Sequence, residues 1–185
     1  MPHIHTGKDQ HDLTVTAYIV RTSSAEPEAL LHMHKKHHVL LPVGGHVELN
    51  ETPWQAVAHE LEEESGYKLD QLNVLQPVSR LKHMSKAVQH PVPVSMNTHY
   101  IAEDHFHTDI EYAFVTTSAP TAMIGDGEST DLRWLTKKEL NELDASEIFD
   151  STKEVYNFIF DEVVPNWESV STRDFTLEYP ENLRY

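Results

Sequence analysis

The chain has 185 residues, a length that favours one domain with a sizeable hydrophobic core. It carries 14 Lys and Arg against 30 Asp and Glu, and a formal net charge of −16 excludes nucleic-acid polymers and anionic membranes as expected partners. It has no cysteine, which excludes disulfides and thiolate zinc sites, and no apolar run of signal or transmembrane length, so we expect a cytoplasmic protein.

Three strands are predicted in the first quarter of the chain. Residues 13–21 are rich in β-branched and aromatic residues with partial alternation, and 28–34 and 38–41 follow as a second and a third strand. Residues 42–45, with the sequence Pro-Val-Gly-Gly, then predict a loop, because glycine backbone bends sharply and can approach a ligand closely.

A helix with clear ends is predicted over residues 52–65. Thr52 fits the N-cap, Pro53 the first helical position and Gln55 the third, which together form a capping box. Gly66 fits the left-handed residue that closes a helix.

Glu60, Glu63 and Glu64 share one side of this predicted helix, because positions i, i+3 and i+4 lie on one face. Like charges at this spacing repel by roughly 0.2–0.5 kcal/mol per pair on an exposed helix. A hard divalent cation such as Mg²⁺ or Mn²⁺ would compensate, since both take carboxylate ligands. The alternative interpretation is an acidic face in contact with solvent.

Strands and helices continue to alternate through the second half of the chain, which predicts an α/β (α+β) protein. Residues 1–164 are interpreted as one domain, and residues 165–185, which contain two prolines and no periodicity, as a C-terminal tail that is wrapped or mobile. The predicted elements are strands at 72–81, 94–101 and 110–117, a short strand near Trp134, and helices at 136–142 and 152–163.

Fourteen histidines are unusual in a chain of this length. Imidazole suits Zn, Ni and Cu, so a His-rich Zn or Ni binder is one hypothesis. The alternative is that the histidines are solvent-facing turn and strand residues, because they lack a compact ligand spacing such as H-E-x-x-H. They include His3, His5 and His11, then His32, His34, His37 and His38, and finally His105 and His107, which we place in a later loop.

The region from Gly45 to Tyr67 resembles the Nudix hydrolase signature G-x5-E-x7-R-E-U-x-E-E-x-G-U, where U is a bulky aliphatic residue. His59 replaces the Arg of the signature, and Tyr67 replaces an aliphatic residue. With weaker similarity in later strands, the resemblance covers roughly residues 12–142 and implies a Nudix-like α/β/α sandwich with a mixed, mostly antiparallel sheet. Seven of the nine specified positions match, namely Gly45, Glu51, Glu60, Leu61, Glu63, Glu64 and Gly66.

The same resemblance implies an enzyme that uses Mg²⁺ or Mn²⁺ to cleave the pyrophosphate bond of a nucleoside diphosphate linked to another moiety X. It implies metal ligation by Glu60, Glu63 and Glu64, with the Gly45 carbonyl as a further ligand. Glu60, Glu63 and Glu128 are the candidate catalytic residues, although Glu128 is equally well explained as a surface residue of a Gly-Asp-Gly turn. The structural or outer-shell candidates are Glu51, His59 and Gly66.

His59 is the departure with a chemical consequence. An Arg at this position would offer five donors that orient neighbouring carboxylates, whereas His offers at most two and titrates near pH 6.5 when unperturbed. We hypothesise that His59 substitutes in part for the Arg.

Two alternatives to the hydrolase stay open: a non-catalytic Nudix-fold module that binds a nucleotide or sugar phosphate, and the His-rich metal binder. The expected partner is a small phosphate compound, and the sequence selects neither its identity nor an oligomeric state, so a homodimer stays open.

Overall fold

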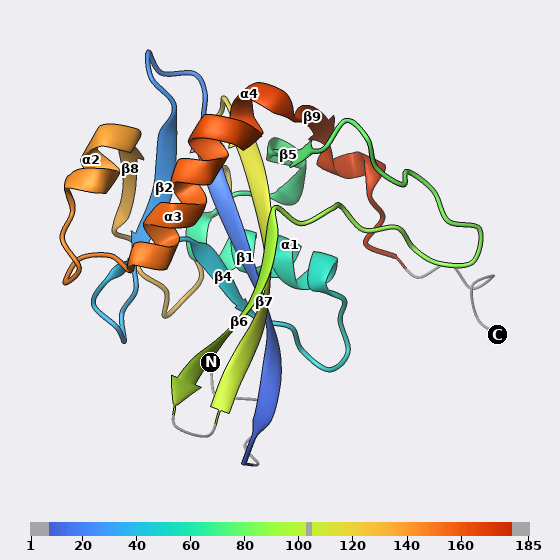
Figure 1. Cartoon of the computed structure of the whole chain (residues 1–185), viewed down its shortest axis with the longest axis horizontal. Helices are drawn as coiled ribbons and strands as arrows, with labels where there is room; N and C mark the ends of the chain where they lie inside the picture. The colour runs from blue at the N-terminus through green and yellow to red at the C-terminus, as the bar shows by residue number, and fades with distance from the viewer. Residues whose placement is uncertain (1–7, 103–104, 179–185) are drawn as a thin grey trace.

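The computed structural model describes residues 8–102 and 105–178, and in this part of the chain nine strands form one mixed sheet with helices on both faces (Figure 1). The strands are β1 (Gln10–Arg21), β2 (Glu28–Met33), β3 (Leu40–Leu41), β4 (Val43–His46), β5 (Asn73–Gln76), β6 (Ser95–Ala102), β7 (His105–Thr116), β8 (Leu132–Thr136) and β9 (Glu168–Ser171). The α-helices are α1 (Pro53–Ser65), α2 (Lys137–Glu142), α3 (Asp150–Phe158) and α4 (Val164–Asn166). In addition, η1 (Leu69–Gln71) and η3 (Thr172–Asp174) are 3-10 helices, and η2 (Ile159–Val163) is a π-helix.

Two long strands, β1 and β7, run parallel through the centre of the sheet, from the pair Gln10–His105 to the pair Arg21–Thr116. The strand order is β3-β2-β1-β7-β5-β9, while β4 also pairs with β1, β6 with β7 and β8 with β2. Among the strands that the structure describes, every pairing other than β1–β7 is antiparallel. The predicted mixed, mostly antiparallel sheet is therefore confirmed.

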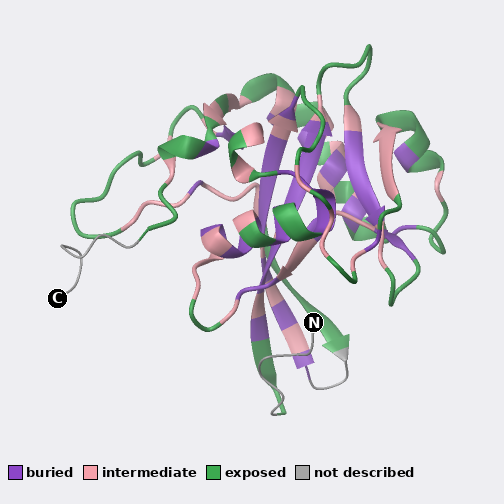
Figure 2. Ribbon diagram, turned by 180° about the vertical axis from the view of Figure 1, so that it is seen from behind, coloured by how far each residue is buried: buried purple, intermediate pink, exposed green. Residues whose placement is uncertain are grey.

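The two faces of the sheet are covered by different helices. The helix α1 packs Trp54, Val57 and Leu61 against one face, and α2 and α3 pack Leu140 and Tyr156 against the other. The buried centre of the long strands lies between these layers (Figure 2). Burying a large apolar side chain stabilises a fold by roughly 1.5–3 kcal/mol, so these three helices are anchored chiefly by such contacts.

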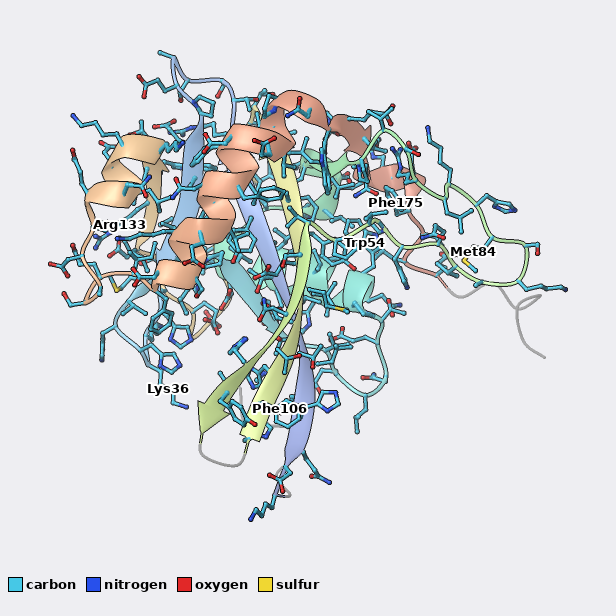
Figure 3. All side chains as sticks on the ribbon, viewed as in Figure 1. Lys36, Trp54, Met84, Phe106, Arg133 and Phe175 are labelled. Atoms are coloured by element: carbon cyan, nitrogen blue, oxygen red, sulfur yellow. The ribbon has the colours of Figure 1, made fainter. Side chains whose placement is uncertain are left out.

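Trp54 is the largest side chain that fixes α1 to the sheet, and it is fully buried. Its ring lies 5.4 Å from that of Tyr112 and 6.0 Å from that of Phe114 on β7. Phe175, from the C-terminal segment, lies 5.8 Å away on another side (Figure 3). The C-terminal segment therefore completes the packing around this helix.

The ends of α1 are those that its sequence predicts. Thr52 and Gln55 form the reciprocal capping box, in which the Gln55 amide donates to Thr52 Oγ1 at 3.2 Å and the Thr52 amide to Gln55 Oε1 at 2.8 Å. Gly66 closes the helix with φ at 71°, and its amide donates to the Glu62 carbonyl at 3.1 Å. A side chain at Gly66 is excluded twice, because its Cβ would also lie 2.5 Å from the Ala122 carbonyl oxygen.

Three predicted boundaries are wrong. The loop predicted at 42–45 is strand β4 from Val43 onward, because β1 supplies an antiparallel partner there. The strand predicted at 72–81 ends at Gln76, before Pro77, which has no N–H to donate to a sheet. His105 and His107, which we placed in a loop, begin β7.

The segment at 165–185 contains a strand that its sequence pattern does not predict. β9 pairs with β5 through Val74 and Val170, and Val170 packs against the core beneath α1. Residues 179–185 lie outside the described residues, as do His3 and His5. No helix in the described part of the chain is long and apolar enough to cross a bilayer.

Candidate active site

Two of the three aligned carboxylates of α1 are buried against the glycines of β4. Glu60 and Glu64 are 3% and 7% exposed. The Gly44 amide donates to Glu64 Oε2 at 2.9 Å, and a Cβ added at Gly45 would lie 2.1 Å from Glu60 Oε1. A side chain at position 45 would therefore displace the Glu60 carboxylate, which occupies the space of its Cβ. The two glycines of β4 therefore let the Glu60 and Glu64 carboxylates lie directly against this strand.

Burial changes the protonation of both side chains. It raises the pKa of Glu60 to about 7, with the charge of His59 opposing and that of Glu63 adding to the increase. It raises the pKa of Glu64 to about 8, while the hydrogen bond from Gly44 opposes the increase. Glu60 Oε1 is buried and accepts no hydrogen bond from the described residues. Two such carboxylates need a positive charge beside them to ionise together at neutral pH.

Glu63 lies differently, on the exposed side of the helix. Its side chain is 49% exposed, and its Oε1 lies 3.0 Å from His59 Nε2. His59 Nδ1 lies 3.9 Å from Glu51 Oε2, and Glu51 Oε1 accepts a hydrogen bond of 2.9 Å from the Glu48 amide. His59 therefore lies between Glu63 and Glu51, the latter fixed to the loop before the helix.

The pKa of His59 follows from this position. Burial lowers the pKa of its imidazole, but the hydrogen bond and charge of Glu63, with the charges of Glu60 and Glu51, outweigh burial and raise the pKa overall. The charged form of His59 is the form that these carboxylates favour. Beside it lies an open hollow of about 330 Å³, lined by His59, Glu62, Glu63, Met123 and Gly125.

The structure does not bring the carboxylates of Glu60, Glu63 and Glu64 together as one preformed metal site. In the part of the chain that it describes, the one group with three potential ligand atoms within 4.8 Å of one another is Asp12, His105 and His107. The physical reason is that Glu63 turns to His59 while Glu60 and Glu64 turn beneath β4. The donor set still fits Mg²⁺ or Mn²⁺, because Mg²⁺ is held by one or two carboxylates plus water and substrate phosphate. The uncompensated, buried Glu60 oxygen is the observation that supports this fit.

A later loop brings Glu128 to the same site. This loop is fastened to the end of α1 by hydrogen bonds from the Ala122 amide to the Gly66 carbonyl at 2.9 Å and from the Gly125 amide to the Glu63 carbonyl at 2.7 Å. The charge of Glu128 raises the pKa of both Glu60 and Glu64, so it lies close enough to act on them. Glu128 itself is half-buried.

His32 is a neighbour of the site that the sequence did not single out. It is 1% exposed, and its Nε2 lies 3.5 Å from Glu64 Oε2. Burial lowers its pKa to about 4, so it is neutral at physiological pH. A polar residue inside the otherwise apolar strand segment Ala29–Met33 was the available signal, because such a residue faces an interior group.

Comparisons with known proteins find a matching family model and similar solved structures. A family model described as NUDIX domain matches residues 11–155. The chain is similar to a hydrolase of the NUDIX family from Clostridium perfringens, with 27% identity over 80% of this chain and 97% of that chain and a TM-score of 0.61.

Two further solved structures share the fold. A C. elegans Ap4A hydrolase has 17% identity over 80% of this chain and 95% of that chain, with a TM-score of 0.57. The NUDIX domain of Shewanella oneidensis NrtR, complexed with ADP ribose, has 15% identity over 80% of this chain and 87% of that chain, with a TM-score of 0.53. No curated protein matches the chain.

Proposed function

The chain belongs to the NUDIX domain family, and we propose that it cleaves the pyrophosphate bond of a nucleoside diphosphate linked to another moiety X, with Mg²⁺ or Mn²⁺. The observation that carries this proposal is the pair of buried carboxylates against the β4 glycines, with a Glu60 oxygen that no described residue satisfies. The family match supports a pyrophosphohydrolase in general, and this geometry supports the metal dependence.

The residues that would hold the ion are Glu60 and Glu64, with Glu63 and the Gly45 carbonyl at the edge of the site. A bound divalent cation supplies positive charge against the anionic diphosphate and lowers the pKa of water. Burial supports this assignment, because Glu60 and Glu64 gain most from a cation in a region of low dielectric. Neutral His32 beside Glu64 adds no competing charge.

Proton transfer is assigned to the less buried carboxylates. Glu63 borders the open hollow, and Glu128 stands on the loop beside it, so both can receive a proton from an attacking water. His59 fixes the orientation of Glu63, and Glu51 fixes His59 against the loop that precedes α1. These contacts support positioning roles for His59 and Glu51. Gly66 lets the loop of Glu128 approach the end of the helix.

The test is a hydrolysis assay with Mg²⁺ or Mn²⁺ and a panel of ADP-ribose, diadenosine polyphosphates, nucleoside triphosphates and nucleotide sugars. Release of phosphate-containing products by the wild type is expected with at least one compound. Glu63→Gln is expected to reduce turnover by about 100- to 10,000-fold, the range for loss of general acid–base catalysis. Glu154→Gln is the matched control, because Glu154 is an exposed helix glutamate on α3, on the opposite face of the sheet.

Two results would contradict the proposal. One is a Glu63→Gln variant as active as the control. The other is tight nucleotide binding by the wild type without hydrolysis of any compound, which would instead favour the non-catalytic binding module.

A further inference from the structure

The central strands carry a second group of potential metal ligands, away from α1. β1, β6 and β7 extend beyond the helices at the lower end of Figure 1. Asp12, His105 and His107 lie on this projecting end, and we call them the Asp–His cluster. Phe106, labelled in Figure 3, marks the place on β7.

Strand register explains why these residues meet. In the parallel pairing of β1 and β7, Asp12 is opposite His107, and Gln10 is opposite His105. Side chains alternate along a strand, so His105 and His107 share one face of the sheet, and Asp12 shares it with them. Phe106, between the two histidines, faces the other side, where its ring stacks on His11 at 5.3 Å.

This face is not the one that α1 covers. Thr14 and Asp109, the next residues of the same face, hydrogen-bond at 3.1 Å, whereas Val15 belongs to the core beneath α1. His46 follows Gly45 on β4 and points to the face of the Asp–His cluster, because its Nε2 lies 3.5 Å from Asp12 Oδ2. β4 therefore lies against the carboxylate site on one face and against the Asp–His cluster on the other.

One distance in the Asp–His cluster equals the separation of two ligands on a tetrahedral ion. Two ligand atoms that lie about 2.0–2.1 Å from one tetrahedral ion are about 3.3–3.4 Å apart. His105 Nε2 and Asp12 Oδ2 are 3.4 Å apart. One ligand atom from each of the three residues lies within 4.8 Å of the others, a separation at which the three could hold one ion.

Burial and ligand chemistry distinguish the cluster from a surface group of histidines. Asp12 is fully buried, and His105 and His107 are 7% and 9% exposed. Two imidazoles with one carboxylate suit Zn²⁺ and related transition metals, while Mg²⁺ prefers oxygen ligands. The ring of His46 lies 4.9 Å from that of His107, so a further imidazole stands next to the three.

We propose that Asp12, His105 and His107 form a binding site for a transition-metal ion of the Zn²⁺ class, separate from the carboxylate site of the proposed hydrolase. The site joins β1 to β7 at the end where helices no longer support the two strands. A metal ion there would fasten this projecting end by direct bonds to both strands.

The test is titration of the metal-stripped full-length protein with Zn²⁺ in excess Mg²⁺, so that Mg²⁺ occupies the carboxylate site. Calorimetry is expected to show one Zn²⁺ per chain, and Co²⁺ as a probe is expected to give the visible absorption of an ion with nitrogen ligands. Asp12→Asn and the double variant His105→Ala/His107→Ala are expected to weaken Zn²⁺ binding by about 100-fold or more, the upper range even for outer-shell partners of a metal site.

Two control variants separate the Asp–His cluster from the other histidines. His83→Ala removes an exposed histidine of the connection between β5 and β6, and it is expected to bind Zn²⁺ as the wild type does. His3→Ala/His5→Ala is expected to do the same. Asp12→Asn changes the charge with little change of volume, so it tests the site if the double variant fails to fold.

Three outcomes would overturn the proposal: wild-type Zn²⁺ affinity in Asp12→Asn, loss of Zn²⁺ binding in His3→Ala/His5→Ala alone, or competition between Mg²⁺ and Zn²⁺ for one site. Loss of hydrolysis in Glu63→Gln with unchanged Zn²⁺ binding would support two separate sites. Failure of the proposed hydrolase activity leaves the Zn²⁺ titration as an independent result, because its readout is binding.

Discussion

The carboxylate site beside α1 and the Asp–His cluster lie on opposite faces of one sheet and are held in place in different ways. Glu60 and Glu64 come from one helix, which is anchored by a fully buried Trp54 and capped at both ends. Asp12 and His107 come from strands far apart in the chain, and strand register alone brings them together. The geometry of the carboxylate site therefore depends on contacts as small as one added Cβ atom. The geometry of the Asp–His cluster depends on the pairing of whole strands.

The largest effects in this comparison are expected from alanine at the two adjacent glycines of β4. One substitution is expected to reduce turnover and the other to reduce stability. The Cβ of Gly45→Ala would lie 2.1 Å from Glu60 Oε1, so the side chain of Glu60 must move. A displacement of about 1 Å in a catalytic site can reduce turnover by roughly 100-fold. We expect that loss in the hydrolysis assay, with unfolding free energy changed by less than about 1 kcal/mol, since a flexible side chain can yield.

Gly44→Ala is the matched variant, and its expected effect is on stability. Its Cβ would lie 2.2 Å from the carbonyl oxygen of Val15 on β1, which is backbone and cannot rotate away. Overpacking of this kind costs about 1–3 kcal/mol, which urea unfolding measures. Full activity of Gly45→Ala would contradict the expected difference between the two variants, because the carboxylate site would then tolerate the added carbon.

A smaller effect is expected in the pH dependence of metal stabilisation. Folding raises the pKa of Glu60 to about 7 and that of Glu64 to about 8, so the folded, metal-free protein holds more protons than the unfolded chain between their ordinary values and about pH 8. The free energy of unfolding therefore falls as pH rises through this range. Mg²⁺ competes with these protons, so its stabilising effect is expected to grow from pH 5.5 to pH 8.5.

The measurement is the shift in melting temperature on adding Mg²⁺, compared between the two pH values. A gain of about 1 kcal/mol corresponds to roughly 2–4 °C for a protein of this size. Glu60→Gln is the control, because it removes one of the titrating groups and is expected to flatten the dependence. A shift that shrinks as pH rises would be the opposite of this expectation.

The smallest effect is expected from His59→Arg. The raised pKa of His59 means that its imidazole carries charge below that pKa and loses it as pH rises, whereas Arg stays charged. The pair with Glu63 is partly exposed, and such pairs contribute about 0.2–1 kcal/mol, or roughly a 1.5- to 5-fold change in rate. The ratio of variant to wild-type turnover is expected to rise by that factor between pH 6 and pH 9. Identical pH–rate profiles would remove the idea that His59 tunes activity.

The sequence predicts those features that depend on neighbouring residues in the chain. The capping box at Thr52, the left-handed Gly66 and the family resemblance are all confirmed, because each depends on spacing within about 20 residues. The separate position of Glu63 could not be predicted, since helical spacing places the three glutamates together whereas the contact with His59 orients one of them outward.

Features that depend on strand pairing could not be predicted from neighbouring residues in the sequence. β9 is recognisable only from its partner β5, and His32 gains its place beside Glu64 only when β2 and α1 come together. The i, i+2 spacing of His105 and His107 indicates a shared face only if they lie in a strand, and we placed them in a loop. The position of Asp12 beside the two histidines follows only from the register of the parallel strands β1 and β7.

The parallel pairing of β1 with β7 also governs how the chain reaches its native state. Thr14 and Asp109, which hydrogen-bond across this pair, are separated by 95 positions. At about 5–20 residues per second on the ribosome, the first strand waits roughly 5–20 s for its central neighbour to be synthesised. Contacts of such long sequence separation slow folding, because a large loop must close before they form. During this interval the strand from Val15 to Val20, most of which is buried in the native core, is without its central neighbour.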